Sequence, residues 1–397
     1  MEMKKYKLGD VGEVRMCKRI LKEDTNTVSG IPFFKIGTFG NVADVFITRK
    51  KFEEYKAKYS YPKKGDVLIS AAGTIGRTVV FNGEEAYFQD SNIVWIENDE
   101  SKVVNALLYY AYKNVKWKVS NGSTILRLYN DDLRRTEIIV PADIQVQKKI
   151  ASILSTLDKR IENLRAQNRV LEQTAKTIYD YTFLQCAGHQ TTYNKPLNRN
   201  IPVDWEVKKL GEIADFKNGI NYDPSKPGDK KTKIVNVRNV SSSTYFISET
   251  DLDDLFVDEK HAAKYYVSQD DILITRSGTP GAARMIAPSK EPVVYCGFII
   301  KMTFEDKKMK NYLFFKMKEL EFAIQKQSAG SILSNISQDI LNNLEIAIPD
   351  ANTLNDFNAQ IEPLLKKQQV NTKQIEALTT QRNTLLPLLM TGQVEVK

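Results

Sequence analysis

The sequence predicts an α+β protein in which two similar α/β domains are joined by two long antiparallel coiled-coil helices, as a pseudo-two-fold internal repeat. Its 397 residues are too many for one ordinary domain. Four sequence blocks from the first half recur in the same order in the second half, at an offset of roughly 205 residues, which indicates duplicated domains rather than a solenoid. Each half ends in a long stretch whose apolar residues are spaced by three and four.

The first two blocks predict the start of each domain. KLGD at 7–10 corresponds to KLGE at 209–212. Next come IPFFKIGTFG from Ile31 and KIVNVRNV from Lys233, which are β-rich runs that end near a polar loop. Both halves are therefore expected to begin in the same way and to continue into strands.

The third block predicts a buried strand that enters a glycine turn. GDVLISAAGTIGR at 65–77 corresponds to DDILITRSGTPGA at 270–282. Pro280 and Gly281 suit the central positions of a type II turn. Two interpretations of these glycines stay open, since they either contact a ligand or only let the chain turn.

The fourth block closes each domain. NGSTILRLYNDDLRRTEIIVP at 121–141 matches SAGSILSNISQDILNNLEIAIP at 328–349, and Gly122 to Pro141 is the same distance along the chain as Gly330 to Pro349. A short helical segment and an exit strand are expected in both copies.

Two long helices follow these blocks. The first is expected to have Asp143 as its N-cap and to stop near Gly188. The second follows Pro349 and stops near Gly392, with a bend or a late start at Pro363, because an interior proline costs about 3 kcal/mol. The predicted seam residues are Leu154, Leu157, Ile161, Leu164, Asn168 and Leu171 in the first helix and Ile361, Leu364, Ile375 and Leu378 in the second, with Gln368, Asn371 and Arg382 as further polar interruptions.

Two arrangements of the helices are possible. Each helix packs only on its own domain, or the two pair with each other, in which case the second must return the chain and the pair is antiparallel. Helices of about 40 residues span roughly 60 Å, so a paired rod would be a spacer between two reading sites. Separations near one turn of B-DNA, about 34 to 36 Å, lie within its reach, and Asn168 would help to fix its register.

Composition excludes several classes of protein. The apolar content of 42%, charged content of 27% and net charge of +8 fit a globular protein and permit a polyanionic partner. We expect a cytoplasmic protein that does not enter the membrane, because the start MEMKKYKLGD is not a signal peptide and the longest apolar runs are short. Three scattered cysteines and the two histidines, His189 and His261, predict exposed loop histidines and no metal site.

Enzymatic chemistry is not evident in the motifs. The GTIG and GTPG turns lack the Gly-Lys-Ser/Thr of a P-loop. The chain has no Pro-Pro, which an adenine methyltransferase motif would need. Asp251, Asp253 and Asp254 are adjacent, but no lysine follows at nuclease spacing, so a solvated acidic turn is the simpler interpretation. We therefore expect no catalytic residues.

The combined blocks resemble a known family over essentially the full chain. The resemblance rests on the segments IPVDWEVKKLGEIADFKNG, GDVLIS with AGTIGR, the IIVP and IAIP exit strands, QKKIASILSTLDKRIENL and LLPLLMTGQVEV. Together and duplicated, they resemble the specificity subunit of a type I restriction-modification system. The resemblance implies target-recognition domain 1 at 1–142, a central coiled-coil helix at 143–190, target-recognition domain 2 at 191–349 and a distal helix and tail at 350–397.

The resemblance also implies a function and partners. Each domain would read one half of a bipartite, asymmetric double-stranded DNA target, while the helical spacer sets the gap and docks two modification (adenine methyltransferase) subunits. In that family two restriction (translocase and nuclease) subunits can join the complex. The chain itself would be non-catalytic and bind no cofactor, with S-adenosylmethionine on the modification subunit. The alternative is a coiled-coil scaffold or protein-interaction module with incidental DNA binding.

Candidate DNA contacts are polar loop residues of the types that read bases or hold phosphates. For each one, an ordinary solvated or structural role is the competing interpretation. Arg77 at the end of the first turn corresponds to Ala282 in the second copy, so the two domains diverge there. The candidates are Lys35, Thr38, Arg77, Gln89, Asn92, Arg127 and Asn130 in the first domain, and Arg238, Asn239, Arg276, Ser277, Arg284, Ser331 and Asn335 in the second.

Overall fold

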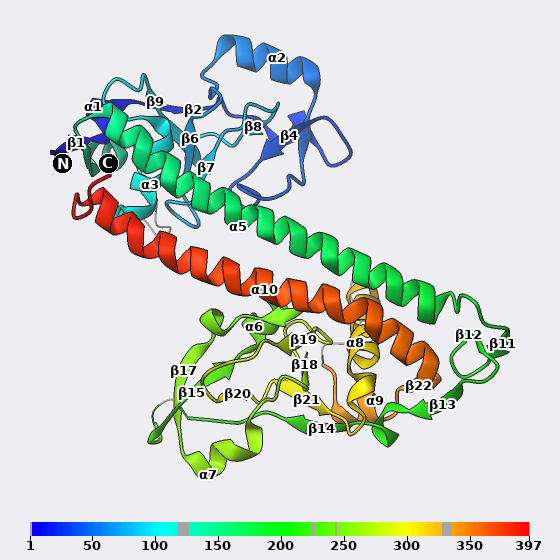
Figure 1. Ribbon diagram of the computed structural model, residues 1–397. Coiled ribbons are helices and arrows are strands. Elements are labelled where there is room, and N and C mark those ends of the chain that lie inside the picture. The colour runs from blue at the N-terminus through cyan, green and yellow to red at the C-terminus, as the bar shows by residue number, and fades with distance from the viewer. Residues whose placement is uncertain are drawn as a thin grey trace. The chain divides into compact units, whose positions relative to one another are not determined.

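The computed structural model divides into two compact units (Figure 1). Unit 1 comprises residues 1–160 and 378–397, and unit 2 comprises residues 161–377. The structure describes residues 2–117, 127–223, 225, 227–242, 244–327 and 335–396.

Unit 1 contains two four-stranded sheets and a separate strand pair. The first sheet has the order β2 (Gly12–Met16), β9 (Ile93–Asn98), β6 (Val67–Ser70) and β7 (Thr78–Val80), all antiparallel. The second has the order β3 (Thr25–Asn26), β5 (Phe46–Ile47), β4 (Ile31–Phe34) and β8 (Tyr87–Phe88), with β4 and β8 parallel. β1 (Met3–Lys7) pairs with β10 (Glu137–Pro141). The helices are α1 (Leu8–Val11), α2 (Arg49–Lys58), α3 (Asn105–Asn114) and α4 (Asn130–Arg135).

Unit 2 repeats this plan with additions. Its larger sheet has the order β14 (Asp215–Asn218), β21 (Ile299–Thr303), β18 (Ile272–Thr275), β19 (Ala283–Ile286) and β16 (Phe246–Ile247). Its smaller sheet has β17 (Asp253–Val257), β15 (Lys230–Val235) and β20 (Val293–Tyr295), with β15 and β20 parallel. β13 (Glu206–Lys209) pairs with β22 (Glu345–Ile348), and β11 (Thr191–Asn194) with β12 (Arg199–Pro202). The helices are α6 (Val237–Ser242), α7 (Glu259–Ala262), α8 (Lys310–Gln327), which lies beside β19 in Figure 1, and α9 (Gln338–Asn342).

The predicted internal repeat is confirmed in the central strands of both units. β6 and β18, the two runs predicted to be buried strands, are buried along their whole length and occupy the same place in their sheets. The opening blocks also fold alike, since the N–H of Leu8 donates to the carbonyl of Thr136 at 2.9 Å and that of Leu210 to the carbonyl of Leu344 at 2.8 Å. The fold is thus the predicted α+β duplication.

The long helices are α5 (Ile144–Tyr179, 36 residues) and α10 (Ala351–Met390, 40 residues). Asp143 caps α5 as predicted, because its Oδ1 accepts the N–H of Gln145 at 2.7 Å. A π-helical turn over Asp180–Leu184 ends α5 shortly before Gly188, the predicted stop, whose φ is 84°.

A late start at Pro363 is wrong. α10 begins at Ala351 and runs through both Pro363 and Pro387. Phe357, Ile361 and Leu365 lie in the core of unit 2 on either side of Pro363. Because burying each such side chain contributes about 1.5–3 kcal/mol, this packing offsets the roughly 3 kcal/mol cost of an interior proline.

The two helices pair in antiparallel fashion within each unit. In unit 2, Asn371 donates to Asn168 at 2.9 Å and Gln368 donates to Glu172, so positions that rise along α5 fall along α10. In unit 1, Nη1 of Arg382 donates to Oδ1 of Asp158 at 2.8 Å. The interpretation in which each helix packs only on its own domain is therefore wrong.

We expect Asn371→Ala to lower the free energy of unfolding by about 1–3 kcal/mol, because it leaves the buried Asn168 amide without its partner. Urea unfolding of the full chain measures this. Gln381→Ala, at an exposed position of the same helix, is the control and should change the value little. An equal effect from both variants would contradict a role for the buried amide pair.

Candidate nucleic-acid interface

The same glycine turn follows β6 and β18. The N–H of Arg77 donates to the carbonyl of Thr74 at 3.3 Å, and that of Ala282 to the carbonyl of Thr279 at 3.2 Å. Gly76 and Gly281 hold the third position of these turns with φ of 82° and 81°, which confirms the type II turn predicted for the second copy. A Cβ on Gly281 would lie 2.8 Å from Cδ1 of Ile324. The turn itself therefore explains these glycines without a ligand.

Three loops of unit 1 gather around this turn. The guanidinium of Arg77 donates to the carbonyl of Phe39 at 2.9 Å, which joins the turn to the loop after β4. Oε1 of Gln89 accepts the N–H of Ile36 at 2.8 Å. Nη2 of Arg127 donates to the carbonyl of Ser91 at 2.8 Å. Predicted residues that lie far apart in the sequence are thus brought together.

The remaining candidates of unit 1 belong to the same loops. Lys35 forms an ion pair with Asp44 at 3.2 Å, and the hydroxyl of Thr38 closes the turn that begins at Lys35. The carbonyl of Asn92 accepts the N–H of Ala71 at 2.8 Å. Asn130, the first residue of α4, lines a cavity of about 490 Å³ together with Met16, Ser91, Arg127, Leu128, Tyr129, Asp131 and Arg134.

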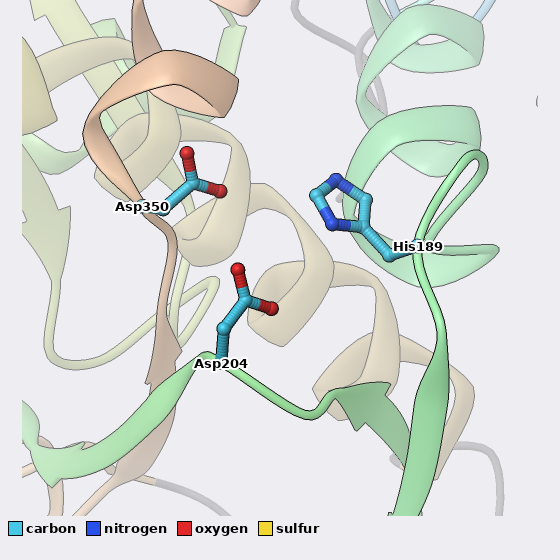
Figure 2. Close-up of side chains that lie close together, drawn as sticks. All are labelled: His189, Asp204 and Asp350. Atoms are coloured by element: carbon cyan, nitrogen blue, oxygen red, sulfur yellow. The ribbon is translucent and has the colours of Figure 1, made fainter.

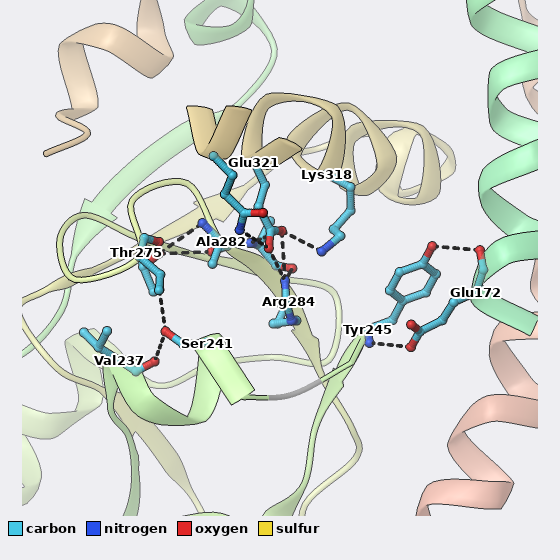
Figure 3. A network of polar contacts seen from close by, with 12 residues as sticks. Glu172, Val237, Ser241, Tyr245, Thr275, Ala282, Arg284, Lys318 and Glu321 are labelled. Atoms are coloured by element: carbon cyan, nitrogen blue, oxygen red, sulfur yellow. Dashed lines mark hydrogen bonds and ion pairs between the residues drawn. The ribbon is translucent and has the colours of Figure 1, made fainter. Parts of the chain in front are cut away.

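Unit 2 gathers the corresponding loops. The carbonyl of Arg276 accepts the N–H of Ile336 at 2.9 Å, which brings Asn335 beside the turn that contains Ser277. The hydroxyls of Ser241 and Thr279 are hydrogen-bonded, so α6 joins the same turn (Figure 3). Arg238 on α6 is exposed and pairs with Asp253 at 2.5 Å. Ser331 lies outside the described residues.

Asn239 and Arg284 are not the surface loop residues that the sequence suggested. Asn239 is buried in α6, where its Oδ1 accepts the N–H of Asn236 at 2.8 Å and its amide donates to the carbonyl of Asp251 at 2.7 Å. Arg284 is buried within β19. Their side chains form contacts inside unit 2, and neither residue belongs to the interface proposed below.

Arg284 belongs to a buried ion-pair network (Figure 3). Its Nη1 lies 2.9 Å from Oε2 of Glu321, and Nζ of Lys318 lies 2.6 Å from the same oxygen. Burial acts to raise the pKa of the Glu321 carboxyl, but Arg284 and Lys318 outweigh it and lower that pKa. The network fixes α8 against β19, directly after the glycine turn.

The predicted seam residues are all buried or half-buried. Buried are Leu154, Ile161, Leu164, Asn168 and Ile361, and half-buried are Leu157, Leu171, Leu364, Ile375 and Leu378. Gln368 and Asn371, which the sequence marked as interruptions, are 1% and 0% exposed and line the helix pair in unit 2. The polar centre of the seam is therefore larger than Asn168 alone.

Two carboxylates on α5 were missed by sequence reasoning. In unit 1, Asp158 accepts from Arg382 of α10 and, at 2.8 Å, from the hydroxyl of Tyr110 in α3. In unit 2, Glu172 accepts from Gln368 of α10 and, at 3.2 Å, from the N–H of Tyr245 (Figure 3 shows the latter contact). Each carboxylate joins the helix pair to a domain. The available signal in the sequence was a charged residue within an apolar pattern.

Three possible metal ligands cluster in unit 2 (Figure 2). Ligand atoms of His189, Asp204 and Asp350 lie within 4.8 Å of one another. However, Asp350 caps α10 and accepts from the N–H groups of Asn352 and Thr353, from the Thr353 hydroxyl and from the Trp205 indole. Four donors fill the acceptor sites of a carboxylate, so capping explains this residue. His189 is half-buried against Trp205, not exposed as predicted.

The comparisons with known proteins agree with this architecture. The family model described as type I restriction modification DNA specificity domain matches residues 1–173 and 202–386. The type I restriction enzyme MjaIX specificity subunit of Methanocaldococcus jannaschii is 29% identical over 367 residues, which are 88% of this chain and 82% of that protein. S.HindORF215P of Haemophilus influenzae is 52% identical over 181 residues, which are 45% of this chain and 47% of that protein, so this match spans about half of each.

A solved structure shares the fold. The S subunit of a type I restriction-modification system from M. genitalium superimposes with a TM-score of 0.60 at 17% identity, over 98% of this chain and 96% of that chain. With two matched repeats and this duplicated architecture, the chain belongs to the family of type I restriction-modification specificity subunits. In the described part of the chain, no helix combines the length and apolarity that crossing a membrane requires.

We expect Arg284→Ala to lower the free energy of unfolding by about 3 kcal/mol, because it leaves Glu321 buried with only Lys318 to compensate its charge. Chemical denaturation of the full chain measures the change. Arg15→Ala, which removes an exposed cross-strand ion pair with Glu97, is the control and should have little effect. If Arg284→Ala were as mild as Arg15→Ala, the buried network would not stabilise unit 2.

We expect the contribution of Glu172 to the stability of the chain to fall as the pH rises above about 4.5, the ordinary value for glutamate, because the pKa of this carboxyl is raised in the folded protein. Burial raises this pKa, so the folded state favours the protonated carboxyl and that stabilisation is lost on ionisation. Glu172→Gln should remove this part of the dependence. Urea unfolding at pH 4 to 7 tests it, and parallel curves for both proteins would refute it.

Proposed function

We propose that this specificity subunit reads a bipartite, asymmetric double-stranded DNA target with two loop clusters, one in each unit. The cluster of unit 1 comprises residues 35–41, 71–77, 89–92 and 127–130, and that of unit 2 comprises residues 236–238, 241, 276–282, 296–298 and 335–337. One observation carries the proposal: the scaffold is duplicated, but the side chains that it presents differ.

The differences fall at equivalent backbone positions. Arg77 and Ala282 both follow the turn glycine. Ala71 and Arg276 both lead from the central strand, and each accepts a backbone hydrogen bond, from Leu128 and Ile336 respectively. Bases are distinguished in the major groove by the pattern of donors, acceptors and methyl groups. Two clusters with different side chains on one scaffold would therefore read different sequences.

The helix pair is proposed to set the gap between the half-targets and to dock two modification subunits, which carry S-adenosylmethionine and methylate adenine. Two restriction subunits can join in this scheme, and the chain itself is non-catalytic. The buried amides of Asn168, Gln368 and Asn371 support it, because a polar group in a seam selects one register over others. The competing proposal, a protein scaffold with incidental DNA binding, predicts no sequence preference.

Mapping adenine methylation in cells tests the function. Cells that carry this chain and its modification partner should methylate one split sequence, and cells without this chain should not. Methylation that lacks any sequence preference would favour the scaffold.

We expect Arg77→Ala and Arg276→Ala each to relax the preference in one half of the target only, and in opposite halves. A base-reading arginine contributes about 1–3 kcal/mol of discrimination, or roughly 5- to 150-fold. Each variant is the control for the other, since the unaltered half should stay fully specific. Relaxation of both halves by one substitution would contradict the assignment of one half-target to each unit.

A further inference from the structure

An exposed aromatic ring stands within the loop cluster of unit 2. Phe298 is 64% exposed, although its neighbours Cys296 and Ile299 are buried. Its backbone is fixed, because its carbonyl accepts the N–H of Arg276 at 2.9 Å. Single exposed apolar side chains are common on protein surfaces, so the place of Phe298 in the duplicated scaffold carries the argument.

The position of Phe298 in the duplication identifies its counterpart. Ser70 pairs with Ile93 in unit 1, and Thr275 pairs with Ile299 in unit 2. Phe298 and Asn92 are therefore the residues that immediately precede equivalent strands. The carbonyl of Asn92 accepts the N–H of Ala71 at 2.8 Å, just as that of Phe298 accepts from Arg276. One backbone position presents an amide in unit 1 and a phenyl ring in unit 2.

These two side chains suit different bases. An asparagine amide pairs with the N6 and N7 edge of adenine in the major groove, whereas a phenyl ring has no donor or acceptor and suits the 5-methyl group of thymine. Polar side chains belong to the same cluster. The guanidinium of Arg276 donates to the carbonyl of Gly297 at 3.4 Å, and Asn335 adjoins the same turn. Groups of this kind read base edges in the same groove.

We propose that Phe298 is a specificity-determining residue that contacts the 5-methyl group of a thymine in the half-target read by unit 2. This inference rests on the proposed function, because it requires that the unit 2 cluster meets the major groove. In that contact the methyl group and the ring are both removed from water. Unit 1 has Asn92 at this position and would not show the same dependence on a thymine methyl.

Binding to modified duplexes tests the contact. The full chain in complex with its modification partner binds the mapped target, in which each thymine in turn is replaced by deoxyuridine, which lacks only the methyl group. The unaltered protein should lose about fourfold in affinity at one thymine of the unit 2 half, the effect of burying one methyl group. Phe298→Ala should bind the thymine duplex more weakly and should not distinguish it from the deoxyuridine duplex.

Two further variants sharpen the test. Phe256→Ala removes an exposed ring from β17 of the same unit, outside the loop cluster, and should keep the fourfold preference for thymine. Phe298→Asn places the unit 1 residue on the unit 2 scaffold and should abolish the preference for the methyl group. Thermal unfolding of each variant confirms that it is folded.

Three results would overturn the inference. The unit 2 half, assigned by the Arg276→Ala variant, could contain no thymine. Phe298→Ala could retain the discrimination between thymine and deoxyuridine. Phe298→Ala could also weaken binding while the unaltered protein ignores the methyl group, as expected for a ring wedged between base pairs in the minor groove. Failure of the proposed function is distinct, because the unaltered complex would then show no preference for any split sequence.

Discussion

Each domain of this protein depends on apolar packing against both long helices, and the rest of the structure follows from that requirement. In unit 1, Ile150 and Leu154 of α5 share one core with Leu389 and Met390 of α10. In unit 2, α5 supplies Tyr179 and α10 supplies Phe357 and Ile361 to a single core. Each core is thus completed by side chains from both long helices. The two helices therefore pair within each unit.

This dependence explains why polar groups are tolerated between the helices. Apolar side chains between two helices stabilise the pair more than polar ones do, but they allow neighbouring registers of similar energy. Asn168, Gln368 and Asn371 are buried, and the last of these keeps an oxygen without a hydrogen-bond partner. A polar group buried in this way lowers stability but selects the single register in which its amide is met. Burial of these amides therefore restricts the helix pair to one register.

The contrast between scaffold and loops is the second organising feature. The turns after β6 and β18 have nearly the same glycine φ angles and the same hydrogen bonds, from Gly76 to the carbonyl of Ser70 at 3.0 Å and from Gly281 to that of Thr275 at 2.9 Å. The residues around these turns nevertheless differ, and Asn92 and Phe298 are the clearest pair. Backbone hydrogen bonds hold each position whatever its side chain, so the side chains of these loops can differ without changes to the fold.

Several elements of the fold depend on local sequence pattern. The duplicated blocks, the buried strands at Val67 and Ile272, the cap at Asp143 and the turn at Gly281 are set by neighbours along the chain, and each was predicted. The antiparallel direction of the helices was also predicted from the order of domains and helices, because the chain must return from the second domain to the first.

The roles of the polar side chains depend on contacts between distant parts of the chain. Arg284 resembled a DNA contact, yet Glu321, 37 positions away, binds it inside unit 2. Pro363 was expected to interrupt α10, yet packing from strands and helices elsewhere in the chain holds the helix together. Asn371 looked like an interruption and is the centre of the seam. Pairing partners and burial come from distant parts of the chain, and local sequence carries no record of them.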